Sequence, residues 1–224
     1  STPRRMFQVV LVPRYRTATL SGGLAALEWN GLNGGILALD ITDTLTLGGT
    51  VSVDGLGFRG GAARQLTGDS GANTDYRTLA SQDNNGPKAE GIVGTPRWLF
   101  NGTANVDTGA EGYPNGSQAR GAPGNAGGGA TDGNPSGNDE NSGGGGGGNG
   151  GQGGYGGNTW NSNLARGGHP GALFPYAIGA TDALIAMGGG GGAASRNNSA
   201  GVQSAGGLGG GIVLIRATSV TGTG

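Results

Sequence analysis

The chain has 224 residues, of which 56 are glycine, and its 13 basic and 14 acidic residues leave a net charge of −1. This weak charge excludes disorder driven by charge repulsion, and the lack of cysteine excludes disulfides and thiolate metal sites. The basic residues are scattered and no apolar run approaches ~18 residues, so we expect neither nucleic-acid binding nor membrane insertion.

The first predicted strands lie near the N-terminus. Phe7, Val9 and Leu11 alternate with other residues before Pro13, which predicts a short strand over 7–12. A second stretch with strand character follows at 17–29.

The sequence ILALDITDTLTLGGTVSVDG, residues 36–55, has the clearest period of two. Its odd positions are mostly apolar and its even positions are mostly Thr, Ser and Asp. This parity persists through the expected breaks at Asp43 and at Gly48–Gly49. A hairpin at Gly48–Gly49 would place apolar residues opposite polar ones on the same face. The pattern therefore favours strands that bend while one face stays inward, as in a sandwich corner or a solenoid.

The region 60–140 is rich in Gly, Asn, Asp, Ser and Pro, and two short motifs near its start resemble catalytic ones. GLGFRG matches the dinucleotide-binding pattern G-x-G-x-x-G, but a glycine-broken segment follows it instead of the required helix. GDSG is similar to the nucleophile motif of chymotrypsin-like proteases, with Ser70 as the nucleophile. The only histidine, His169, follows Ser70 instead of preceding it. We therefore predict that the protein is not an enzyme.

A candidate cation site lies in DGNPSGNDENSG, residues 132–143. Oxygen-bearing side chains in its first half have the spacing of a calcium-binding loop. The twelfth position is Gly143, where such loops have a bidentate glutamate, so a solvated turn is the alternative. No other cofactor is predicted. The predicted calcium ligands are Asp132, Asn134, Ser136 and Asp139.

The stretch SGGGGGGNGGQGGYGGNTW, residues 142–160, has a period of three. Two registers contain only glycine over 144–157, and the third carries Asn149, Gln152, Tyr155 and Asn158. A polyproline II helix has three residues per turn and no internal hydrogen bonds, so its backbone groups must pair with neighbouring segments. Further glycine series could supply such neighbours. We predict a bundle of polyglycine II helices within 115–210, with a flexible linker as the alternative.

The C-terminal segment GGGIVLIRATSVTGTG, residues 209–224, resembles the earlier strand region. Gly35–Leu39 aligns with Gly211–Ile215, which predicts that the two segments share one β layer. Before it, GATDALIAMG at 179–188 has room for at most two helical turns. The predicted apolar layer comprises Leu37, Leu39, Ile41, Leu45, Leu47, Val51, Val53, Ile212 and Leu214.

Four segments carry a resemblance to known proteins: GGILALDITDTLTLGGTVSVDGLGFRGG, EGYPNGSQARGAPGNAGGG, GGGGGGNGGQGGYGGN and GGGIVLIRATSVTGTG. Together they resemble glycine-rich segments of large, uncharacterised bacterial surface or secreted proteins, over most of 34–224. The resemblance implies an extracellular, repeat-rich protein and brings no site residues. In style the chain is also similar to the glycine-rich domain of the anaplastic lymphoma kinase receptor family. That domain is a ligand-binding module in which polyglycine II helices lie beside β-strands.

These observations predict an all-β protein with almost no α-helix, in which sandwich or solenoid-like strands accompany a polyglycine II bundle. We expect one domain over 1–224, β-rich at 1–60 and 208–224, with glycine helices and loops at 61–207. The expected function is that of an extracellular structural protein that self-assembles into a fibre, sheath or surface layer. The alternative is an adhesin or phage tail-type receptor-binding module that recognises a glycan or another cell-surface ligand.

Overall fold

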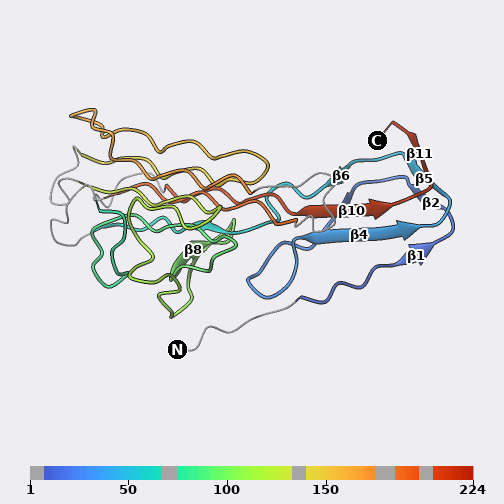
Figure 1. Ribbon diagram of the computed structural model, residues 1–224, viewed down its shortest axis with the longest axis horizontal. Coiled ribbons are helices and arrows are strands. Elements are labelled where there is room, and N and C mark those ends of the chain that lie inside the picture. The colour runs from blue at the N-terminus through green and yellow to red at the C-terminus, as the bar shows by residue number, and fades with distance from the viewer. Residues whose placement is uncertain (1–7, 67–74, 133–139, 175–184, 197–203, 224) are drawn as a thin grey trace. The chain divides into compact units, whose positions relative to one another are not determined.

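The computed structural model describes residues 8–66, 75–132, 140–174, 185–196 and 204–223. Within these residues the protein is all-β: no α-helix occurs, and the regular structure consists of eleven short strands in four small sheets (Figure 1). No helix long and apolar enough to cross a membrane was found among them.

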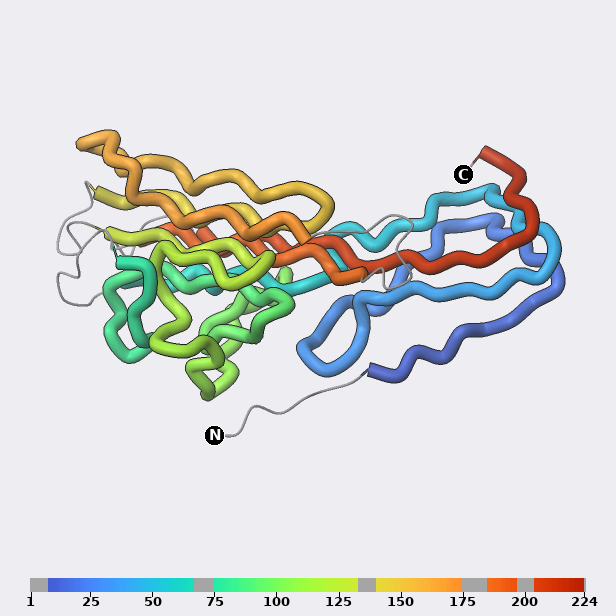
Figure 2. Tube along the Cα trace, in the orientation of Figure 1, coloured from blue at the N-terminus to red at the C-terminus, as the bar shows by residue number. Residues whose placement is uncertain are grey.

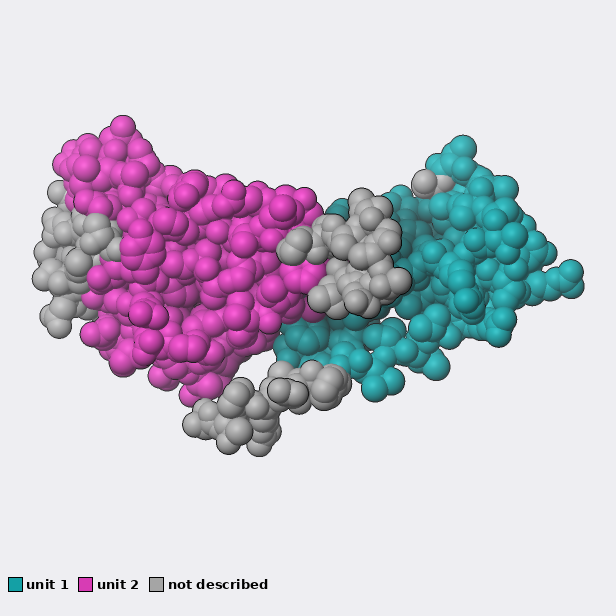
Figure 3. All heavy atoms as spheres, viewed as in Figure 1, with its two compact units in different colours: residues 1–57, 210–224 teal, residues 58–209 magenta. Residues whose placement is uncertain are grey.

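The contacts of the chain divide it into two compact units (Figure 3). Unit 1 comprises Ser1–Gly57 and Gly210–Gly224, and unit 2 comprises Phe58–Gly209. Unit 2 is therefore inserted into the chain of unit 1. That the two form a single domain over 1–224 stays a prediction.

In unit 1 the chain follows the same bent path in three passes. The first pass contains β1 (Arg14–Tyr15), β2 (Ala18–Leu20) and β3 (Leu24–Ala25). The second contains β4 (Ile36–Ile41), β5 (Thr44–Leu47) and β6 (Val51–Ser52), and the third contains β10 (Ile212–Arg216) and β11 (Ser219–Gly222). All pairings between passes are parallel. They form the sheets β1–β4–β10, β2–β5–β11 and β3–β6, with the second pass in the middle.

The period of two in the sequence explains which residues of the second pass are buried. Leu37, Ile41 and Leu45 are at most 6% exposed and form the core of unit 1. The strands break at 42–43 and 48–50, as the sequence predicts. β5 and β6 pair with other passes and not with each other, so the exclusion of a hairpin at Gly48–Gly49 is confirmed.

The predicted partnership of the two similar segments is also confirmed, because β4 and β10 lie side by side (Figure 1) with Ile36 opposite Ile212. Two details were wrong. Ile212 and Leu214 lie opposite Ile36 and Ala38, on the other face from Leu37, so neither is part of the apolar layer, and Leu214 is 44% exposed. The described residues of the predicted strand at 7–12 form no strand. These described residues do not pair with another strand, and Val9 and Leu11 are exposed.

The described residues of unit 2 form one regular sheet and a set of glycine segments. The antiparallel sheet consists of β7 (Gly60–Gly61), β8 (Trp98–Phe100) and β9 (Asn105–Asp107). Leu66 and Leu99 are fully buried, and so is the Glu90 carboxylate, which pairs with Arg59 at 2.9 Å. The helix candidate at 179–188 lies mostly outside the described residues.

The glycine segments are joined by backbone hydrogen bonds that recur every three residues, and Figure 2 shows them running side by side. Segment 143–148 is central. Gly143 and Gly146 donate to Gly157 and Gly154, and they accept from Gly168 and Gly171. Gly145 and Gly148 donate to Gly128 and Asn125, and they accept from Gly192 and Gly189. One segment therefore bonds to four neighbours.

Close packing separates two kinds of glycine in 142–157. A Cβ atom on Gly147 would lie 1.9 Å from the carbonyl oxygen of Gly189, so no side chain fits there. On Gly151, Gly154 and Gly157 a Cβ atom would meet nothing within 4 Å. The first half of the stretch is thus enclosed on every side, whereas the second half has one open row. Tyr155, on the row with side chains, is 70% exposed.

Candidate interaction surface

Only one of the four predicted calcium ligands falls among the described residues. Asp132 is fully buried, while Asn134, Ser136 and Asp139 lie outside the described residues. No group of three His, Cys, Asp or Glu side chains in the described ranges could hold a metal ion. The calcium site therefore stays a prediction.

The residues of the discounted protease motif are also only partly described. Ser70 lies outside the described residues. His169 packs its ring between those of Tyr76 and Tyr155, with centroids 5.1 and 5.2 Å away. Burial, together with the positive charges of Arg120 and Lys88, lowers the pKa of His169. The absence of enzyme activity stays a prediction.

Unit 1 has two free sheet edges. The first pass forms one edge and the third pass forms the other, and no described strand pairs with their outer sides. The N–H of Ile212 donates inward to Gly35 at 2.8 Å. Because N–H groups alternate sides along a strand, the N–H of Val213 faces the free edge. Val213 is 39% exposed, and Val220 on β11 is 57% exposed. These edges can accept further strands.

A row of three charged residues crosses the outer face of the sheet β1–β4–β10. The register places Asp40 between Arg14 and Arg216. Arg216 donates through Nε and Nη2 to the two Asp40 oxygens at 2.7 and 2.6 Å, and Arg14 Nε lies 3.4 Å from Oδ2. The hydrogen bonds from Arg216, followed by the charges of Arg216 and Arg14, lower the pKa of Asp40. Both arginine side chains are largely exposed, at 68% and 75%.

Hydroxyl groups form similar rows across the sheet β2–β5–β11. Thr46 lies between Thr19 and Thr221 in the register. The hydroxyls of Thr46 and Thr221 are 3.2 Å apart, and those of Thr44 and Ser219 are 2.9 Å apart. In this sheet, hydroxyl residues of one pass therefore lie beside hydroxyl residues of the next.

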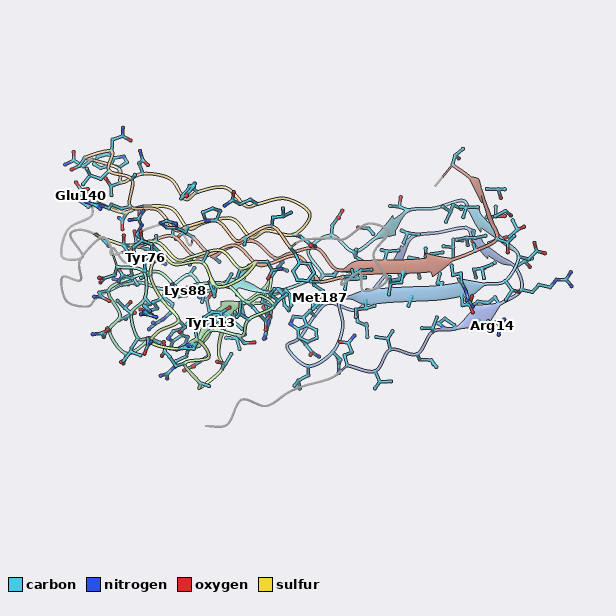
Figure 4. All side chains as sticks on the ribbon, in the orientation of Figure 1. Arg14, Tyr76, Lys88, Tyr113, Glu140 and Met187 are labelled. Carbon is cyan, nitrogen blue, oxygen red and sulfur yellow. The ribbon has the colours of Figure 1, made fainter. Side chains whose placement is uncertain are left out.

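Unit 2 offers a separate pocket of about 360 Å³, whose lining includes Tyr76, Lys88 and Tyr113 (Figure 4). Tyr76 is 56% exposed at this pocket, whereas Tyr113 is buried and its hydroxyl lies 2.6 Å from the carbonyl oxygen of Ala89. Burial, followed by the charge of Glu90, raises the pKa of Tyr113 well above its ordinary value. The phenol is held in place by its contacts with the carbonyl oxygens of Ala89 and Gly94.

The sequence interpretation missed the charged row, although part of the signal was present. Continuing the alignment of Gly35–Leu39 with Gly211–Ile215 by one residue places Asp40 beside Arg216. Arg14 lies in the first pass, which is not part of this alignment, so the alignment does not reach it.

Comparisons with protein-family models, with curated proteins and with solved structures find no match to this chain. The two sheet edges and the charged row are therefore interpreted from their own geometry.

Proposed function

We propose that this protein is an extracellular structural protein whose copies assemble head to tail through the two edges of unit 1. One observation carries the proposal: the passes run parallel, and the first and third passes pair with the same residues of the second, such as Asp40 and Thr46, so the free side of the third pass matches the free side of the first. A location outside the cell is supported by the resemblance to glycine-rich bacterial surface proteins.

In this proposal, unit 1 is a short β-solenoid that continues from one copy into the next. The row from Thr19 through Thr46 to Thr221 would proceed to Thr19 of the following copy, in the pairing that already exists within each copy. Each contact joins two different surfaces and leaves both outer ends open. Such heterologous contacts produce filaments unless the rotation closes a ring.

We further propose that the glycine segments of unit 2 are polyglycine II helices. The support is the recurrence of hydrogen bonds every three residues between neighbouring segments, together with glycine rows that leave no room for a Cβ atom. A bundle of this kind would make each subunit of the polymer rigid, although its segments carry few side chains.

The test is a substitution that blocks one edge without disturbing the subunit. Val213→Pro removes an N–H that faces the free edge and none that β10 donates to β4. We expect wild-type protein in phosphate buffer to form polymers, seen by negative-stain microscopy and sedimentation. The variant should stay unassembled, with an unchanged circular dichroism spectrum.

Val213→Thr is the matched control, because it keeps the N–H and the β-branched shape, and it should still assemble. Wild-type protein that stays monomeric at all concentrations contradicts the proposal. A monomer that binds glycans favours the second candidate function, a receptor-binding module. The observation that favours this candidate is the pocket beside the exposed Tyr76 ring, since aromatic faces are common contacts of ligands.

A further inference from the structure

The register between stacked copies is fixed by the shape of the passes. A slip by one residue would exchange the inner and outer faces. A slip by two residues would move the bends at 16–17, 42–43 and 217–218 out of line. The strands on both sides of these bends could then not pair at the same time, as they do within a copy. The third pass of one copy can therefore meet the first pass of the next only in the register that places Arg216 beside Arg14 and Val220 beside Ala18, because the residues of each pair share one partner in the second pass.

This register brings two arginines together. Within a copy each arginine of the charged row borders the Asp40 carboxylate. At the junction, Arg216 of one copy would be the strand neighbour of Arg14 in the next, across a strand spacing of about 4.8 Å. No carboxylate would lie between them, and like charges directly opposite each other destabilise strand pairing.

Both guanidinium groups keep donors for another ligand. Each has five N–H donors. Arg216 uses Nε and Nη2 on Asp40, and the Arg14 contact with Asp40 is through Nε. A pocket of about 340 Å³ opens beside the row, and its lining includes Arg14, Asp40, Arg216 and Thr218.

We propose that a small oxyanion of the phosphate class binds at each junction, between Arg216 of one copy and Arg14 of the next. The inference rests on the self-assembly proposed above. The oxyanion would take the place that the Asp40 carboxylate has inside each copy, because a tetrahedral oxyanion and a carboxylate both accept paired hydrogen bonds from guanidinium groups. Assembly would then depend on the kind of anion present and not only on the ionic strength.

The experiment compares inorganic phosphate with sodium chloride at equal pH and ionic strength, using the whole chain. Sedimentation gives the lowest protein concentration at which polymer forms. Screening by salt is equal in the two buffers. We expect a threshold at least about tenfold lower in phosphate, since hydrogen bonds between charged groups are stronger than neutral ones. Arg14→Gln removes one of the two facing charges, so its thresholds in the two salts should be equal.

Arg16→Gln is the matched control. Arg16 lies on the same edge and its side chain is 87% exposed, but the corresponding residue of the third pass, Thr218, is uncharged. This variant should keep the wild-type difference between the salts. Equal wild-type thresholds, or a phosphate effect that persists in Arg14→Gln, would overturn the anion site and leave self-assembly standing. A folded wild-type chain that forms no polymer in either salt overturns the self-assembly itself.

Discussion

Lys88 shows how one side chain can secure segments that have almost no regular structure. Its ammonium group donates to the carbonyl oxygens of Tyr76, Ala119 and Gly121 at 2.6, 2.9 and 2.6 Å. These three bonds use every donor of the group. Because the side chain is only 3% exposed, the bonds are shielded from water, and they join segments that strand ladders do not connect.

Stability should depend on pH through Lys88. Burial, followed by the charge of Arg77, lowers the pKa of Lys88 to about 7, whereas an unfolded lysine titrates near 10.4. Between these values the unfolded chain binds more protons, so the free energy of unfolding should rise as pH increases from 7 to about 10. The rise is about 1.4 kcal/mol per unit of difference in pKa. It is measured by urea denaturation of wild type against Lys88→Met.

The difference between the wild type and Lys88→Met isolates this group from others that titrate in the same window. A difference that stays constant from pH 7 to 10 would mean that the three carbonyls keep Lys88 charged throughout. The sequence offers no sign of this arrangement, because Lys88 stands out only as the one lysine of the chain. Its partners are backbone groups, which have no sequence signature.

At the scale of the elements, the glycine rows allow a comparison within one stretch of chain. Gly147→Ala would bring a Cβ atom to 1.9 Å from the Gly189 carbonyl oxygen, so the backbone must shift. We expect a loss of about 2 kcal/mol or more in the free energy of unfolding, by analogy with overpacked cores. Chemical denaturation monitored by circular dichroism gives this value.

Gly154→Ala is its control, because a Cβ atom there meets nothing within 4 Å. This variant should be neutral or more stable by about 0.4–1 kcal/mol, since alanine reduces the freedom of the unfolded chain. If the two variants are equally stable, 142–157 is a linker and the bundle interpretation is wrong.

The sequence predicted the elements of unit 1 better than those of unit 2. A period of two identifies faces and bends, and the segments TATL at 17–20 and TLTL at 44–47 even repeat a motif that the register brings together. The same repeat could have revealed the first pass. In unit 2, a period of three identifies which residues share a row. It leaves open which row is enclosed, because that depends on neighbours distant in the sequence.

For the whole molecule, the insertion of unit 2 into unit 1 predicts that the units fold separately. The ends of unit 2 are adjacent, because the N–H of Gly209 donates to the Phe58 carbonyl at 2.8 Å, and insertions with close ends are well tolerated. We expect residues 58–209 alone to unfold cooperatively on heating. Unit 1, with residues 57 and 210 joined by a short linker, should keep its β-type circular dichroism spectrum.

Each product is checked by the dispersion of its amide resonances in solution. A fragment 58–209 with the narrow dispersion of an unfolded chain would show that unit 2 needs unit 1. The shortened unit 1 also tests the self-assembly proposal. If it forms polymers without unit 2, the assembly surface lies in unit 1.

The third pass of unit 1 also has a consequence for biosynthesis. Arg216 pairs with Asp40 across a separation of 176 residues, so β4 and β5 leave the ribosome long before β10 and β11. At 5–20 residues per second the delay is roughly 10–35 s. During this interval the unpaired side of β4 is open to β10 of a neighbouring nascent chain, and exchange of the third pass between chains becomes a competing route to oligomers.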